Sequence, residues 1–195
     1  MAEELLIPRK QYLSTGIQFG RVGVNKKMKR FIYKIKPNGI AIFDLKKIDE
    51  RIRIIGKFLA NHDVYVTTRK KIAFQALEKF GKITGIKVHT GRFLPGTFTN
   101  PSSESFYEPD ALFVVDPVVD KQAIREAIIS NIPIIAICDS KTDPADIDII
   151  LPANNRGKRS LFLIFWLLAR EVLKIRGEIK SYEEFKPSYE EFLEG

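Results

Sequence analysis

The feature that most constrains this chain is an alternation between short apolar runs and longer amphipathic stretches. The short runs are near-continuously apolar or β-branched, as strands buried on both faces are. They are Gly39–Phe43, Asp63–Thr67, Ile86–His89, Ala111–Val115, Ile134–Cys138 and Asp148–Leu151. The stretches Leu45–Ala60, Lys70–Phe80 and Asp120–Ser130 carry apolar residues at spacings of three and four, which predicts helices. This order predicts a three-layer α/β fold, a mostly parallel sheet with helices on both faces.

The region after residue 151 predicts one long helix and a short tail. The helix is apolar nearly all round, with Asn155 or Ser160 as a cap and Gly177 as the stop, so we expect it to be buried. Residues 181–195 form an acidic, aromatic tail in which Ser-Tyr-Glu-Glu-Phe occurs twice, and Pro187 should interrupt any helix there. We expect its rings to pack on the single domain formed by residues 1–180. A protein-interaction module that docks through the tail is the alternative.

Composition favours a single-domain cytoplasmic protein. The 195 residues, 45% of them hydrophobic, suffice for one sizeable core. Cys138 is the only cysteine, so we expect no internal disulfide and no thiolate metal site. The longest apolar run, Leu161–Ala169, is too short to cross a bilayer, and the first residues lack a signal-peptide pattern. No membrane partner is therefore expected.

The net charge of +8 is unevenly distributed along the chain, which indicates a polyanionic partner. Residues 1–100 hold 21 Lys or Arg and 7 Asp or Glu, a net charge of +14, whereas residues 101–195 carry −6. This asymmetry predicts one basic face, for which nucleic acid is the leading ligand. No recognition motif for duplex DNA is present. A basic surface carried on loops suits folded RNA, which proteins recognise largely by shape and backbone.

The basic arm, residues 9–36, is the principal candidate for RNA binding. Between residues 21 and 36 it contains seven cations and no acidic residue. The seven are Arg21, Lys26, Lys27, Lys29, Arg30, Lys34 and Lys36. Lysine offers phosphate a point charge and arginine a two-pronged donor, and the interleaved glycines let the backbone approach oxygens. The arm is expected to be loose without RNA, because its charges repel.

Further basic residues are expected to join the arm on one rim of the sheet. They are Arg69, Lys70 and Lys71 after a strand, Arg156, Lys158 and Arg159 at the start of the last helix, and Arg92 in "GRFLPGTFTNP". Helix starts already favour anions through their free N–H groups. Beside Arg92, the apolar side chains of Phe93, Leu94 and Phe98 are expected to anchor their loop in the core.

Aspartates at predicted strand ends leave an enzymatic alternative open. Ligands of open parallel sheets bind at such ends, where Asp44, Asp116 and Asp139 fall, and carboxylates there can hold Mg²⁺ for phosphoryl transfer. Against this, the chain has no phosphate-binding glycine loop and no nucleophile elbow, and its two histidines have no metal-ligand spacing.

Each aspartate also has an ordinary local role. Asp44 and Asp120 stand at helix starts, and Asp116-Pro117 and Asp143-Pro144 stand at turns. This second interpretation predicts that "AICDSKTDPADIDIILP" is a strand, a turn and a strand. No metal, cofactor or catalytic residue is then expected.

Five segments together resemble the universal small-subunit ribosomal protein S2 family. In chain order they are "TGIQFGRVGVNKKMKRFIY", "TTRKK", "GRFLPGTFTN", "PDALFVVD" and "NIPIIAICDSKTDPADIDIILPANN". In the first segment Gly16, Phe19, Gly20, Asn25, Lys27, Met28, Phe31 and Ile32 match the family signature. The chain is similar to the archaeal and eukaryotic branch, which includes the laminin-receptor homologue. Only residues 101–108 stand where the bacterial branch inserts a coiled-coil hairpin.

The resemblance implies a flavodoxin-like or Rossmann-like domain in the small ribosomal subunit, bound to ribosomal RNA near the junction of head and body. It implies neighbouring ribosomal proteins as partners and a place on the cytoplasmic ribosome. It implies no catalytic activity, no cofactor and no small-molecule substrate. Tails of the eukaryotic relatives take part in protein contacts, but the tail here is shorter than those.

Overall fold

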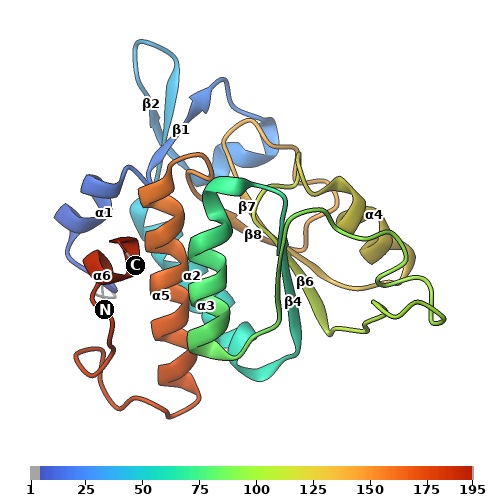
Figure 1. Ribbon diagram of the computed structural model, residues 1–195. Helices are drawn as coiled ribbons and strands as arrows, with labels where there is room; N and C mark the ends of the chain where they lie inside the picture. Colours follow the sequence, from blue (N-terminus) through green and yellow to red (C-terminus); the bar gives the residue numbers. More distant parts are fainter. Residues whose placement is uncertain (1–4, 195) are drawn as a thin grey trace.

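The computed structural model describes residues 5–194 and confirms the predicted layered α/β fold (Figure 1). Five parallel strands form the main sheet in the order β5-β4-β6-β7-β8. They are β4 (Val64–Thr68), β5 (Val88–Thr90), β6 (Ala111–Val114), β7 (Ile134–Cys138) and β8 (Ile149–Pro152). Every residue of β4, β6 and β7 is buried, because helices cover both faces of the sheet, and this explains the unbroken apolar runs.

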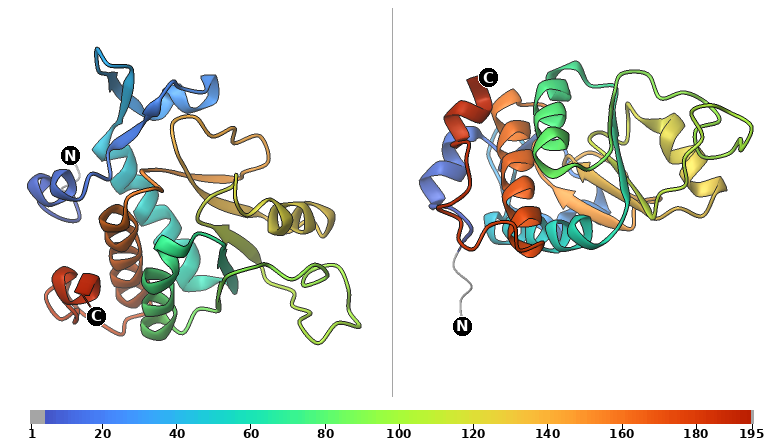
Figure 2. Two further views of the ribbon diagram at one scale, coloured as in Figure 1. Left: turned by 45° about the horizontal axis from the view of Figure 1, so that its top comes forward. Right: turned by 60° about the horizontal axis from the view of Figure 1, so that its bottom comes forward.

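Helices lie on both faces of the main sheet. Figure 2 shows α4 (Lys121–Ile129) on one side, and α3 (Phe74–Thr84) and α5 (Lys158–Ile175) on the other. The chain moves in one direction from β4 to β5 and in the other from β6 to β7, so right-handed crossovers place α3 and α4 on opposite faces. The direction switches between β4 and β6, which is where folds of this kind hold their ligands.

Helix α2 (Leu45–Asn61) packs against α5 and β8. A Cβ atom at Gly56 would lie only 2.6 Å from the Cβ of Glu171, so glycine is what allows the close approach of α2 and α5. Within α5, all residues from Ser160 to Leu173 are buried, as the apolar sequence predicts. No helix within residues 5–194 combines the length and hydropathy needed to cross a membrane.

The basic arm contains its own secondary structure. It comprises α1 (Arg9–Thr15), β1 (Phe19–Val22), the 3-10 helix η1 (Lys26–Phe31) and β2 (Ile32–Ile35). Strands β1 and β2 pair antiparallel with the two sides of β3 (Ile40–Phe43) in a separate sheet of order β1-β3-β2. The prediction that Gly39–Phe43 is a strand of the parallel sheet is therefore wrong. Its local sequence predicts an extended strand, but the choice of partner depends on β1 and β2.

Some predicted helix starts also differ in the structure. The segment predicted to be helical from Lys70 begins with the 3-10 turn η2 (Lys71–Ala73), and α3 then continues to Thr84. Helix α5 follows Gly157, so neither Asn155 nor Ser160 caps it. Asp44 does cap α2, since its Oδ1 accepts a hydrogen bond from the Lys46 N–H at 3.0 Å.

The aromatic tail packs on α5, as predicted. Pro187 precedes the short helix α6 (Tyr189–Glu194), so the tail is not one helix. Phe192 meets the Phe162 ring edge-on with centroids 5.8 Å apart, and Phe185 meets the Trp166 ring in the same way at 5.9 Å. The Trp166 indole N–H also donates to the Pro187 carbonyl at 3.0 Å. These rings therefore complete the core on the outer side of α5.

Candidate nucleic-acid interface

Ser140, in the loop between β7 and β8, joins the basic arm to the main sheet. Its Oγ accepts a hydrogen bond from the Arg21 N–H at 2.7 Å and lies 3.3 Å from the carbonyl oxygens of Arg21 and Gly23. Its carbonyl accepts from the Asn25 N–H at 2.9 Å. Opposite Ser140, a Cβ at Gly20 would lie 2.8 Å from the serine Cβ. The arm is thus held at the carboxyl edge of the sheet by close polar contacts.

Asp139 lies beneath two of the candidate arginines. Its Oδ2 is 3.8 Å from the Nε of Arg21 and 3.8 Å from the Nε of Arg156, and the carboxylate itself is buried. Burial raises the pKa of Asp139, and its hydrogen bond from Ser140 and the two arginines oppose that rise. Both arginine side chains remain about half exposed, Arg21 at 42% and Arg156 at 55%. Asp139 therefore orients two cations whose outer sides face solvent.

The crevice between β4 and β6 is filled by the protein's own polar groups. Lys70 Nζ lies 2.6 Å from Asp116 Oδ2, and both side chains are largely buried. Asp116 also accepts from the Val118 N–H at 3.1 Å, so the turn predicted at Asp116-Pro117 is confirmed. Asp120 does not cap α4 as predicted, but accepts from the Arg69 N–H at 2.7 Å. Burial raises its pKa to about 6.

The candidate basic residues are mostly exposed and mostly unpaired. Four form ion pairs with the protein's own aspartates: Arg21 and Arg156 with Asp139, Lys70 with Asp116, and Lys27 with Asp143. The others make no ion pair with a carboxylate of residues 5–194, and all but the half-buried Lys36 are exposed. They are Lys26, Lys29, Arg30, Lys34, Lys36, Arg69, Lys71, Arg92, Lys158 and Arg159.

Most of these cations share the carboxyl edge of the main sheet. Arg69 and Lys71 follow β4, and the Arg156–Arg159 cluster follows β8. Arg92 lies just after β5, and the neighbouring Gly91 N–H donates to the Thr68 carbonyl at the end of β4. The η1 residues lie beside the β7–β8 loop, through the Asn25 and Lys27 contacts. Lys34 and Lys36 lie farther out, on and after β2, which projects from the domain (Figure 1).

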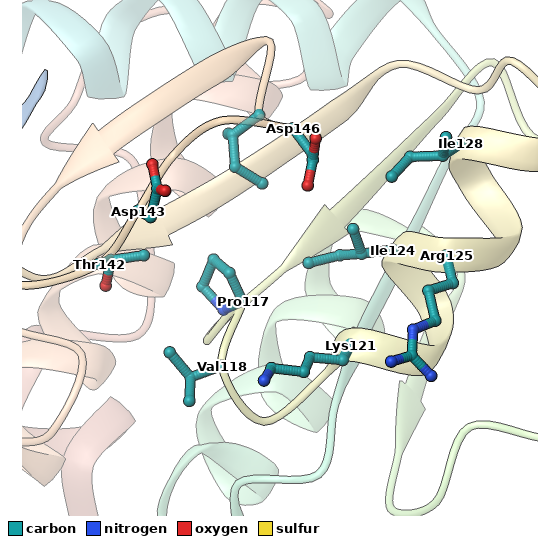
Figure 3. Close-up of a pocket in the computed structure, with 10 residues that line it drawn as sticks. Pro117, Val118, Lys121, Ile124, Arg125, Ile128, Thr142, Asp143 and Asp146 are labelled. Atoms are coloured by element: carbon teal, nitrogen blue, oxygen red, sulfur yellow. The ribbon is translucent and has the colours of Figure 1, made fainter.

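The strand-end aspartates do not assemble into a metal centre within residues 5–194, where no three His, Cys, Asp or Glu side chains come together. Asp44 follows a strand of the arm sheet and caps α2, whereas Asp116 and Asp139 pair with cations. Around the β7–β8 loop, Asp143 and Asp146 line a groove opposite Lys121 and Arg125 of α4 (Figure 3). Asp44, Asp116 and Asp139 therefore have structural partners.

The loop after Arg92 is anchored in the core, largely as expected. Phe93 and Phe98 are buried, but Leu94 is 51% exposed, so that part of the prediction is wrong. The sequence does not reveal the main anchor of this loop. The buried carboxylate of Glu126, on α4, accepts hydrogen bonds from the Gly96 N–H at 2.9 Å and the Phe98 N–H at 3.2 Å.

Asn154 and Asn155 are further site residues that sequence reasoning missed. Asn155 donates to the carbonyls of Val115 and Ile137, which joins the ends of two strands. Asn154 donates to the Gly16 carbonyl at 3.1 Å and so holds the start of the arm. The only sequence signal was a pair of amides three and four residues after a predicted strand, where side chains commonly bond to loop backbone.

The strand-end crevice is closed by the Lys70–Asp116 ion pair and lies beside a rim of exposed cations, which defines a layered α/β protein with a basic binding edge. Proteins named small ribosomal subunit protein uS2 match nearly the whole chain. The relative from Methanococcus maripaludis strain C6 is 45% identical over 98% of this chain and 87% of its own length. The relative from Thermoplasma acidophilum is 43% identical over 98% of each chain, and that from Pyrobaculum islandicum is 46% identical over 97% of this chain and 94% of its own. Residues 102–174 also match the family described as Ribosomal protein S2. The chain belongs to the ribosomal protein S2 family.

Proposed function

We propose that this protein is a structural component of the small ribosomal subunit and binds ribosomal RNA through the basic arm and the carboxyl edge of its main sheet. The observation that carries the proposal is the set of exposed, mostly unpaired cations gathered there in a chain of the ribosomal protein S2 family. The protein acts by positioning RNA and neighbouring ribosomal proteins, without catalysis. Its place is the ribosome, in the cytoplasm.

Two kinds of contact support binding to the RNA backbone. Lysines of η1 offer point charges, and the arginines oriented by Asp139 offer paired N–H donors, which suit phosphate oxygens. The polar contacts of Ser140 hold the arm on the domain, so its cations face the RNA as one surface with those after β4 and β8. A fixed array of this kind recognises the shape of a folded RNA.

Reversing three unpaired cations of η1 tests the proposal. The variant Lys26→Glu, Lys29→Glu, Arg30→Glu should fold normally, because these side chains are exposed. It should fail to join small subunits, since three attractions to phosphate become repulsions. The measurement is co-sedimentation of the protein with small subunits, together with affinity for ribosomal RNA fragments.

The matched control places the same charge change at the opposite end of the molecule. Lys57, Lys82 and Lys180 are exposed residues near the ends of α2, α3 and α5 that lie away from the carboxyl edge. The variant with all three changed to Glu should still join the subunit. If both variants co-sediment like the unchanged protein, or if both fail equally, the assignment of the interface is wrong.

A further inference from the structure

A groove lies between α1 and the antiparallel sheet of the basic arm, apart from the carboxyl edge of the main sheet. Its volume is about 620 Å³, within the usual range of small-molecule sites. Leu13, Phe19, Tyr33 and Ile42 give it apolar walls. Of the contacts described so far, only the Asp44 cap of α2 lies in this groove.

The groove holds the exposed aromatic rings of the protein. Within residues 5–194, Phe19 at 38% and Tyr33 at 67% are the only exposed side chains of Phe, Tyr or Trp, and both line this one groove. All other Phe, Tyr and Trp residues of that range are buried or half-buried. The Tyr33 ring makes no ring contact within the described residues, whereas Lys36 Nζ lies 4.9 Å from the centroid of the Phe19 ring. Exposed rings gathered in one groove indicate a ligand with a flat face.

The rim of the groove is strongly basic. Arg9, Lys34, Lys36 and Lys46 line it, and the single carboxylate, Asp44, is occupied as the cap of α2. The ligand therefore combines a flat apolar part with negative charge. A nucleotide has both, since bases stack on aromatic rings and phosphates pair with lysine and arginine.

RNA is favoured over an acidic peptide because the groove is continuous with the proposed RNA surface. Lys34 and Lys36 belong to the basic arm and also line the groove. A strand of RNA that follows the arm can therefore place one unpaired base in the groove without leaving the basic surface.

We propose that this groove binds an unpaired nucleotide of RNA, with its base stacked on Tyr33 and its phosphates on Lys34, Lys36 and Arg9. This inference rests on the proposed function, because it requires that the protein bind RNA. It adds a site that recognises an unstacked base, whereas the carboxyl edge binds backbone alone.

The test compares a short oligoadenylate with an abasic oligonucleotide of the same length, by fluorescence anisotropy at constant low salt. Tyr33→Ala should weaken binding of the oligoadenylate by about tenfold, the typical effect of losing one stacked base. It should leave binding of the abasic strand unchanged. Tyr33→Phe, which keeps the ring, should bind as the unchanged protein does.

Ile35→Ala is the matched control, because Ile35 lies on the same strand, is 54% exposed and does not line the groove. The groove assignment is overturned if Tyr33→Ala behaves like Ile35→Ala, or weakens both oligonucleotides equally. It is also overturned if an acidic aromatic peptide binds the groove more tightly than the oligoadenylate. If the unchanged protein binds neither RNA probe nor ribosomal RNA, the proposed function itself fails.

Discussion

Single residues at the carboxyl edge carry charge in places where burial disfavours it. Asp120 is only 2% exposed, and its carboxylate accepts the Arg69 N–H while lying close to Asp116. The sequence predicts Asp120 correctly as a residue at a helix start, but not its bond to the turn after β4. That partner is 51 positions away along the chain, so local patterns do not contain it.

The raised pKa of Asp120 gives a pH-dependent contribution to stability. The group has an ordinary pKa of 3.8 when unfolded and about 6 when folded, so the folded protein binds more protons between these values. The free energy of unfolding should therefore fall as the pH rises through this window, by at most about 3 kcal/mol. Urea unfolding across the window should show a steeper fall in the unchanged protein than in Asp120→Asn, in which only other groups such as Asp139 still contribute. Parallel curves for the two proteins would contradict the prediction.

Among the elements, the parallel strands were predictable and the arm sheet was not. Strands such as β6 and β7 are buried on both faces, so their apolar runs identify them without knowledge of their partners. Strands β1 and β2 are largely exposed, and each is only four residues long and contains a cation, Arg21 or Lys34, so neither forms an unbroken apolar run. Gly20 was a usable signal, since an isolated glycine in a strand indicates close approach of another segment.

The contact between β1 and the β7–β8 loop depends on the absence of a side chain at residue 20. In Gly20→Ala, the new Cβ would collide with Ser140, so the arm should shift and stability should fall by about 1 to 3 kcal/mol. Removing the serine side chain as well, in Gly20→Ala with Ser140→Gly, should relieve the collision but not restore the lost hydrogen bonds.

Chemical denaturation and limited proteolysis of the arm measure both effects. Val22→Ala is the control, because Val22 lies on the same strand and is 62% exposed. Gly20→Ala should be cut within the arm faster than this control. Equal stability and equal cutting of the two variants would show that the close approach at Gly20 is unimportant.

At the scale of the whole molecule, charge is divided between regions. The first 100 residues carry a net charge of +14 and the rest −6. Basic residues of the arm stand at the edge of the main sheet together with those after β4 and β8, so cations from both halves of the sequence meet at one edge. Composition predicts the sign of the partner's charge. The position of the surface required the contacts of Ser140 and Asn154, which link segments far apart in the chain.

Salt dependence measures how many phosphates this surface contacts. The logarithm of the affinity for ribosomal RNA should fall linearly with the logarithm of salt concentration, by about 0.7 to 0.9 for each phosphate contacted. Several contacts should give a slope of several units. The η1 charge-reversal variant should have a slope that is shallower by about 2 units, because three contacts are lost. A flat response in the unchanged protein would mean that backbone phosphates do not dominate binding.

The packing of Phe185 and Phe192 on α5 has a consequence for how a newly made chain folds. During synthesis, α5 emerges before these two rings, which are needed to cover Trp166 and Phe162. Until they arrive, one side of the longest helix presents bare aromatic surface to water. This side of α5 is therefore covered only after Phe185 and Phe192 have been made, and until then the exposed rings favour aggregation.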